Sequence, residues 1–165
     1  MIRGSLAAAM AAMALAACTH AAAPAPGAEL SPQARWEAGQ AARLAWNARQ
    51  AGWRTTESGL QHRRVKAAPA ASPKPEPGAT VTIHYTGTFI DGREFDSSRT
   101  RGEPATFPLG QLIKGWQEGV PMMRVGERWL FLIPADLAYG DRSRAPIPPN
   151  SALYFDIELV AIPAP

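Results

Sequence analysis

Cysteine and histidine are scarce in this 165-residue sequence, which contains one cysteine and three histidines. The single cysteine, Cys18, has no second thiol to pair with, and His20, His62 and His84 lack the close spacing of metal-binding motifs. The sequence also lacks a glycine-rich phosphate-binding loop and a serine within a Gly-x-Ser-x-Gly motif. We therefore predict a protein that uses no metal ion, no cofactor and no cysteine or serine nucleophile.

An excess of one charge sign and long apolar runs are missing as well. The 17 basic and 14 acidic residues give a formal net charge of +3 and are scattered along the chain, whereas a nucleic-acid surface needs clustered Lys and Arg. No run of 18 or more apolar residues occurs beyond the N-terminus, so no internal membrane span is predicted. The composition, 46% hydrophobic and 19% charged, is that of a globular domain with no nucleic-acid partner.

The first seventeen residues have the composition of a secretory signal. Arg3 precedes an apolar stretch, Leu6 to Ala17, that is too short to span a bilayer and is followed by small residues. Leu15-Ala16-Ala17-Cys18 resembles the bacterial lipobox, in which the cysteine receives lipid and becomes the first residue of the mature protein. An ordinary signal with a chance cysteine is the alternative. We expect lipidation of Cys18, because an exported protein gains little from one unpaired thiol.

The residues after Cys18 form two further segments before the folded domain. An Ala/Pro-rich stretch without periodicity is typical of a flexible tether. After it, Ser31 is a good N-cap, Pro32 suits the first helical position and Gly52 suits a C-terminal cap, which predicts a helix over 32–51. That helix could be a spacer on the domain or form a homodimer with a second copy. The predicted parts are a signal peptide (1–17), a lipidated tether (18–30), a helical segment (31–53) and a domain (54–165).

The periodicity changes to that of strands after Thr55. Thr80 to Phe89 alternates apolar and polar residues, as half-buried strands do, and Asp91-Gly92 directly after it predicts a hairpin. Lys114 to Val120 is the one candidate helix in this part. No βαβ rhythm is present, so we predict an α+β fold with an antiparallel sheet of about five strands and one short helix packed on it. The other predicted strands are 59–66, 127–133 and 151–162.

A set of aromatic residues with a few polar companions remains as the candidate site. Any one of them alone is more often part of a core than of a site. Together with their neighbours, however, they form segments that closely resemble the FKBP-type peptidyl-prolyl cis-trans isomerases, in that family's order and approximate spacing. Residues 55–61 also resemble the first strand of exported bacterial members with a helical N-terminal extension. The matching segments are 84–87, 91–98, 107–116, 138–140, 147–149 and 153–159.

The resemblance implies a twisted antiparallel sheet curled around a short helix, with the site between them. It implies an aromatic cup with a floor, walls and a rim. The floor would be Trp116, the walls Tyr85, Phe95, Phe107 and Phe155, and the rim Leu112 and Ile113, with Ile147 as a further substrate contact.

The resemblance also implies roles for a few polar groups. Tyr139 and the backbone N–H of Ile113 would donate hydrogen bonds to bound carbonyls, and Asp96 would lie beside the reacting amide, held by Arg101 and Tyr85. A turn residue that caps the following Ser97-Ser98 is the alternative for Asp96. We expect a structural and electrostatic role for it rather than proton transfer, because a buried charge needs paired, hydrogen-bonded partners.

Three departures from the family pattern concern a wall of the cup and the segments around it. Ala105 replaces an aromatic that many members have, Gln111 begins a shortened stretch, and the loop at 141–146 carries Arg142 and Arg144. If these arginines reach a bound peptide, acidic residues near the proline should favour binding.

The function implied is that of a peptidyl-prolyl cis-trans isomerase acting on proline-containing segments of exported polypeptides. Rotation about an X-Pro amide breaks no bond, so an apolar cup that favours the twisted amide is sufficient and no cofactor is needed. A chaperone that uses the same cup without turnover is the alternative. We expect a periplasmic protein attached to the membrane by lipid on Cys18, in the outer membrane rather than the inner because Thr19, not aspartate, follows the cysteine.

Overall fold

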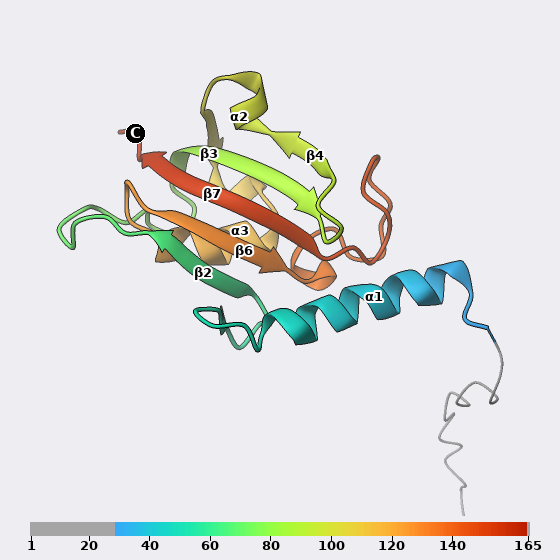
Figure 1. The fold of residues 1–165 in the computed structure, drawn as a ribbon. Helices are drawn as coiled ribbons and strands as arrows, with labels where there is room; N and C mark the ends of the chain where they lie inside the picture. The colour runs from blue at the N-terminus through green and yellow to red at the C-terminus, as the bar shows by residue number, and fades with distance from the viewer. Residues whose placement is uncertain (1–28, 165) are drawn as a thin grey trace, which may run out of the picture.

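A seven-stranded antiparallel sheet and a long helix beside it make up the computed structural model, which describes residues 29–164 (Figure 1). The sheet order is β1-β2-β6-β7-β3-β4, and β5 pairs with another part of β3. The predicted signal peptide, Cys18 and the tether up to residue 28 lie outside the described residues. The main elements are α1 (Pro32–Asn47), β1 (Arg54–Thr55), β2 (Gln61–Lys66), β3 (Thr80–Phe89), β4 (Glu94–Ser97), α2 (Ser98–Arg101), β5 (Ala105–Pro108), α3 (Lys114–Gly119), β6 (Arg128–Ile133) and β7 (Leu153–Ala161).

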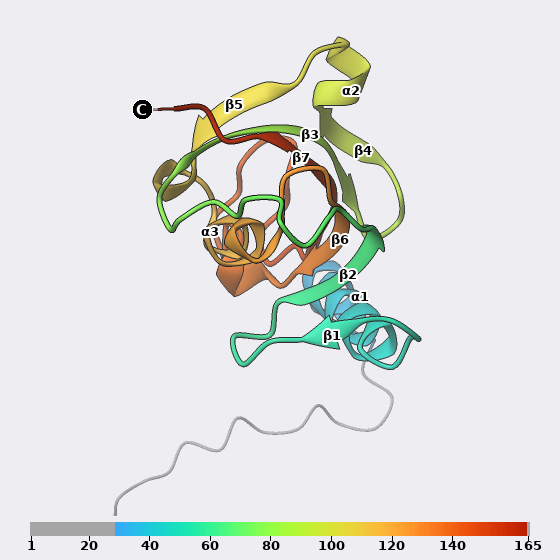
Figure 2. The same ribbon diagram turned by 90° about the vertical axis from the view of Figure 1, so that its left-hand side faces the viewer.

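The predicted α+β fold is confirmed, with α3 enclosed by the curled sheet (Figure 2). Apolar side chains alternate along β3 as predicted, so that Val81, Ile83, Tyr85 and Phe89 are buried. The predicted hairpin joins β3 to β4, with Gly92 at a φ of 90° in its turn. Because both central strands bury one face, the core lies between the sheet and α3.

Two glycines allow α3 to lie directly on β6. A Cβ added to Gly115 would lie 2.5 Å from Cγ2 of Ile133, and one added to Gly119 would lie 2.6 Å from Cε1 of Phe131. Real side chains do not approach this closely, so the close packing of α3 depends on glycine at both positions. This packing places Trp116, on the intervening turn, against the inner face of the sheet.

The N-terminal helix begins as predicted but is shorter. The hydroxyl of Ser31 accepts a hydrogen bond from the backbone N–H of Ala34 at 3.1 Å, and Pro32 is the first helical residue. The predicted range of 32–51 was wrong at its end, because α1 stops at Asn47. The buried side chain of Asn47 donates to Oε1 of Gln61 at 2.8 Å, which ties the end of the helix to β2. Tight turns follow.

Polar contacts join α1 to the loop between β6 and β7. The indole N–H of Trp36 donates to the carbonyl of Pro149 at 3.2 Å, and Oε1 of the buried Gln40 accepts from the backbone N–H of Ala152 at 3.1 Å. Glu37 accepts from the side-chain amide of Asn150 at 2.7 Å. The helix therefore rests on its own domain, on the side opposite α2 (Figure 1).

The sheet has more strands than the periodicity indicated. Besides β4, which the predicted hairpin implied, the additional elements are β1, β5 and α2, which are two to four residues long, too short for a period to appear in sequence. The short strands β1, β4 and β5 pair with the longer strands β2 and β3, and α2 follows β4. Within residues 29–164, no helix is both long and apolar enough to cross a membrane.

Candidate active site

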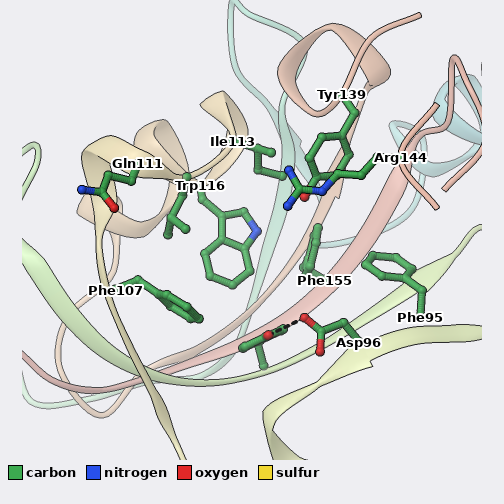
Figure 3. A pocket seen from close by; sticks show the side chains of 11 residues that line it. Phe95, Asp96, Phe107, Gln111, Ile113, Trp116, Tyr139, Arg144 and Phe155 are labelled. Atoms are coloured by element: carbon green, nitrogen blue, oxygen red, sulfur yellow. Dashed lines mark hydrogen bonds between the residues drawn. The ribbon is translucent and has the colours of Figure 1, made fainter. Parts of the chain in front are cut away.

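A cavity of about 270 Å³ opens between α3 and the inner face of the sheet (Figure 3). It is lined by side chains from most of the domain, namely from β3, β4, β5, α3, β7 and two loops. The lining residues are Tyr85, Phe95, Asp96, Phe107, Gln111, Leu112, Ile113, Trp116, Tyr139, Arg144 and Phe155.

The aromatic rings of the cavity meet edge to face around Trp116. Its indole lies 5.1 Å from the ring of Phe155 at 86° and 5.2 Å from that of Tyr85 at 79°. Phe155 in turn meets Phe95 at 5.7 Å and 89°. Such perpendicular pairs contribute roughly 0.5–1.5 kcal/mol each beyond the burial of their area. The rings therefore hold one another in place, and the cavity has a rigid apolar floor and walls.

The floor contains one polar atom without a conventional partner. Nε1 of Trp116 is buried, and within the described residues no oxygen or nitrogen atom accepts its hydrogen bond. An unpaired buried donor typically costs about 1–3 kcal/mol.

Gly87 makes room for two of the walls. A Cβ at this position would lie 2.7 Å from both Cε1 of Phe155 and Cζ of Phe95. The backbone of β3 therefore passes directly beneath the two rings, which occupy the space that a side chain would fill. Gly87 belongs to the segment that resembles the family, but the sequence alone assigned it no role.

A hydrogen-bonded triad occupies the polar side of the cavity. The hydroxyl of Tyr85 donates to Oδ2 of Asp96 at 2.5 Å, while Arg101 donates to Oδ1 of Asp96 at 2.5 Å and to the hydroxyl of Tyr85 at 2.9 Å. The guanidinium of Arg101 also lies 5.6 Å from the centre of the Tyr85 ring. Each member of the triad thus contacts both of the others.

The triad keeps Asp96 ionised. Burial alone would raise the pKa of Asp96, but the hydrogen bonds from Tyr85 and Arg101, together with the charge of Arg101, outweigh burial and lower it. The pKa of Tyr85 is raised, first by burial and then by its hydrogen bond to Asp96. At neutral pH the site therefore presents a fixed carboxylate and a neutral phenol, which suits electrostatic orientation better than proton transfer.

Nine of the predicted site residues line the cavity, and two do not. Arg101 stands behind Asp96 and acts on the cavity through it. Ile147 is buried in the hydrophobic core and is not among the residues that line the cavity, so its predicted substrate contact stays a prediction. The two arginines of the 141–146 loop differ in position, because Arg144 lines the cavity and Arg142 does not.

Gln111 lines the cavity although it was not predicted as a site residue. Its sequence signals were its place immediately before Leu112 and Ile113 and the shortened stretch that it begins. Within residues 29–164, no group of three or more His, Cys, Asp or Glu side chains is arranged to hold a metal ion.

Comparisons with known proteins agree with this geometry. The family model of the FKBP-type peptidyl-prolyl cis-trans isomerases matches residues 72–160. The chain is 52% identical to the FKBP-type peptidyl-prolyl cis-trans isomerase FkpA of Aeromonas hydrophila over 124 residues, which cover 74% of this chain and 45% of that protein. It is 48% identical to the outer membrane protein MIP of Legionella longbeachae over 106 residues, covering 64% of this chain and 45% of that protein.

A solved structure shows the same fold. The crystal structure of FkpA from Escherichia coli matches with a TM-score of 0.69 and 40% identity, covering 81% of this chain and 65% of that one. The chain spans about half the length of the curated relatives it matches. Because the family model covers more than half of the chain, including nearly all of the cavity-forming elements, this protein belongs to the FKBP-type peptidyl-prolyl cis-trans isomerase family.

Proposed function

We propose that this protein is a peptidyl-prolyl cis-trans isomerase that accelerates rotation about X-Pro bonds in exported polypeptides. The observation that carries the proposal is the rigid aromatic cavity over Trp116, with the ion-paired carboxylate of Asp96 at one side. The matches to isomerases in sequence and in fold support it.

The chemistry requires binding rather than bond breaking. Resonance across the amide imposes a barrier of about 18–20 kcal/mol to rotation, and X-Pro bonds populate both isomers because these differ by only roughly 0.5–1 kcal/mol. As the bond twists, resonance is lost and the amide becomes less polar. An apolar cavity that excludes water therefore stabilises the twisted amide relative to the solvated planar one, which lowers the barrier.

Individual residues have distinct parts in this proposal. The rings of Trp116, Phe95 and Phe155 would enclose the pyrrolidine ring. The hydroxyl of Tyr139 and the backbone N–H of Ile113 would donate to carbonyls flanking the proline. The carboxylate of Asp96, held by its two partners, would orient the amide without taking up a proton, since its pKa is lowered.

The test is acceleration of isomerisation in a short X-Pro peptide, measured by exchange NMR or by protease coupling. We expect a clear acceleration by the mature protein, and a loss of roughly tenfold or more in kcat/KM for Phe95→Ala, since a wall of the transition-state site is removed. Trp46→Ala is the matched control, because Trp46 is an exposed aromatic on the outer face of α1. Absence of acceleration by the wild-type protein refutes the proposal.

We propose further that the protein acts in the cell envelope, anchored to the periplasmic side of the outer membrane by lipid on Cys18. The lipobox-like tetrad ending at Cys18 supports the anchor, and the similarity to the outer membrane protein MIP supports the envelope location. The test is the mass of the mature N-terminus together with membrane fractionation. A Cys18→Ser variant that stays in the membrane fraction refutes the anchor.

Homodimerisation through residues 32–51 stays a prediction. One face of α1 rests on the domain through Trp36, Gln40 and Asn47, and the opposite face is exposed. Analytical ultracentrifugation of the mature protein measures whether that exposed face joins two copies.

A further inference from the structure

Arg144 lies at the mouth of the cavity and lines it together with Tyr139 (Figure 3). Its guanidinium lies 5.1 Å from the centre of the Tyr139 ring, a distance at which a cation is attracted by the π-face. This stacking orients the guanidinium on the side of the cavity where Tyr139 and Ile113 lie, across from Asp96 (Figure 3).

The backbone at Arg144 is held in a short bridge rather than at a loop tip. Arg144 exchanges hydrogen bonds with Ile147: its N–H donates to the carbonyl of Ile147 at 3.0 Å, and the N–H of Ile147 donates back. The base of the same loop is closed by the N–H of Asn150, which donates to the carbonyl of Gly140 at 2.7 Å. Asn150 is in turn held by Glu37 of α1. The position of this arginine is therefore supported from within the loop and from outside it.

The charge of Arg144 is not balanced by a neighbouring acid. Within residues 29–164, no carboxylate lies within 4.0 Å of its guanidinium, although Asp141 lies in the same loop. Among the residues that the structure describes, Asp96 is the one carboxylate lining the cavity, and both of its oxygens already accept hydrogen bonds, from Tyr85 and Arg101. The cavity thus has one paired carboxylate and one unpaired guanidinium.

We propose that Arg144 makes this site selective for substrates that carry an acidic side chain next to the proline. The inference rests on the isomerase function proposed above and names the substrate class of that site. Arginine binds a carboxylate through a planar fork of donors, and its attraction strengthens as a bound peptide displaces water from around the pair.

The test compares peptides that differ only by Glu or Gln, placed directly before or directly after the proline. We expect wild-type kcat/KM to favour Glu by about twofold to fivefold in at least one of these positions at low ionic strength, the range of an exposed charged pair. The preference should shrink as salt is raised to about 1 M, where the screening length falls to roughly 3 Å.

Two variants test whether Arg144 causes the preference for Glu. Arg144→Gln should bring the Glu-to-Gln ratio close to one. Arg142→Gln, two positions earlier in the same loop but outside the cavity lining, should retain the wild-type ratio. Equal rates for Glu and Gln peptides in the wild-type protein overturn the inference, and so does a ratio that Arg144→Gln leaves intact or that both variants lose alike. Failure of all peptides to be accelerated is a different result, which overturns the isomerase function itself.

Discussion

Replacing Gly87 by alanine should distort the cavity, although the backbone conformation at this position suits alanine. The residue lies in the middle of β3, its φ is not positive, and alanine adds one methyl group. That methyl would lie 2.7 Å from Phe95 and from Phe155, whereas carbon atoms in contact prefer about 3.5–4.0 Å. Both rings must therefore move back by roughly 0.8 Å, or the strand must shift away from them.

The size of the effect follows from those contacts. Forcing an extra carbon into a packed core typically costs about 1–3 kcal/mol of stability. Displacement of a transition-state site by about 1 Å can lower a rate by roughly a hundredfold. We expect Gly87→Ala to lower the free energy of unfolding by about 2 kcal/mol and kcat/KM on a neutral X-Pro peptide by about tenfold to a hundredfold.

Two other glycine variants provide the comparison, with stability measured by urea denaturation and activity by the peptide assay. For Gly110→Ala, no atom of the described residues other than the two chain neighbours lies within 4 Å of the new Cβ, so this variant should change little. Gly119→Ala meets Phe131 at 2.6 Å, outside the cavity lining, so it should lose a similar amount of stability but less activity. The reasoning is refuted if folded Gly87→Ala keeps its kcat/KM within about twofold of wild type, or if Gly119→Ala loses as much activity.

Three further outcomes are expected. Tyr85→Phe removes a hydrogen bond that lowers the pKa of Asp96, so that pKa should rise toward its ordinary value. A carboxyl group whose pKa is lower in the folded than in the unfolded state stabilises the fold above the unfolded pKa, and this stabilisation is lost as the pH falls through the folded pKa. With a smaller pKa difference, the Tyr85→Phe variant should therefore lose less stability on acidification. NMR titration of Asp96 checks the shift, and an unchanged pKa contradicts it. Gln40→Leu leaves the buried N–H of Ala152 without its acceptor and should cost about 1–3 kcal/mol in thermal denaturation, whereas wild-type stability would show that another group replaces it. At Gly39, in the middle of α1, no atom of the described residues outside the nearby backbone of the helix lies within 4 Å of an added Cβ. Gly39→Ala should therefore stabilise the fold by about 0.5–1 kcal/mol, and destabilisation would mean that this face has a partner.

Much of the fold was predictable from short-range pattern. The alternation in 80–89 predicted β3 at both of its ends, and Asp91-Gly92 predicted the hairpin that follows it. Lys114 to Val120 predicted α3 to within one residue. Elements of two to four residues, such as β1 and β5, escaped because they are shorter than the period that would reveal them.

The chemical character of the site was also present in the sequence. Nine residues named from the family resemblance line one cavity, and Asp96 has the two partners that the resemblance implied. The position of Ile147 in the core, and the inclusion of Gln111 in the lining, could not be obtained in the same way. Both depend on which side of a loop faces the cavity, and loop residues have no period from which to read a direction.

The sequence by itself determined where the long strands and α3 lie, because alternation and turn residues act over a few neighbouring positions, and its resemblance to the family named the aromatic residues of the cup. Only the tertiary structure decided where α1 ends, since Asn47 is held by Gln61 on another element. It alone distinguished Arg144 from Arg142, and it alone showed that Gly87 leaves space for two rings. Contacts of this kind join residues distant along the chain, and their geometry exists only once the whole domain has packed.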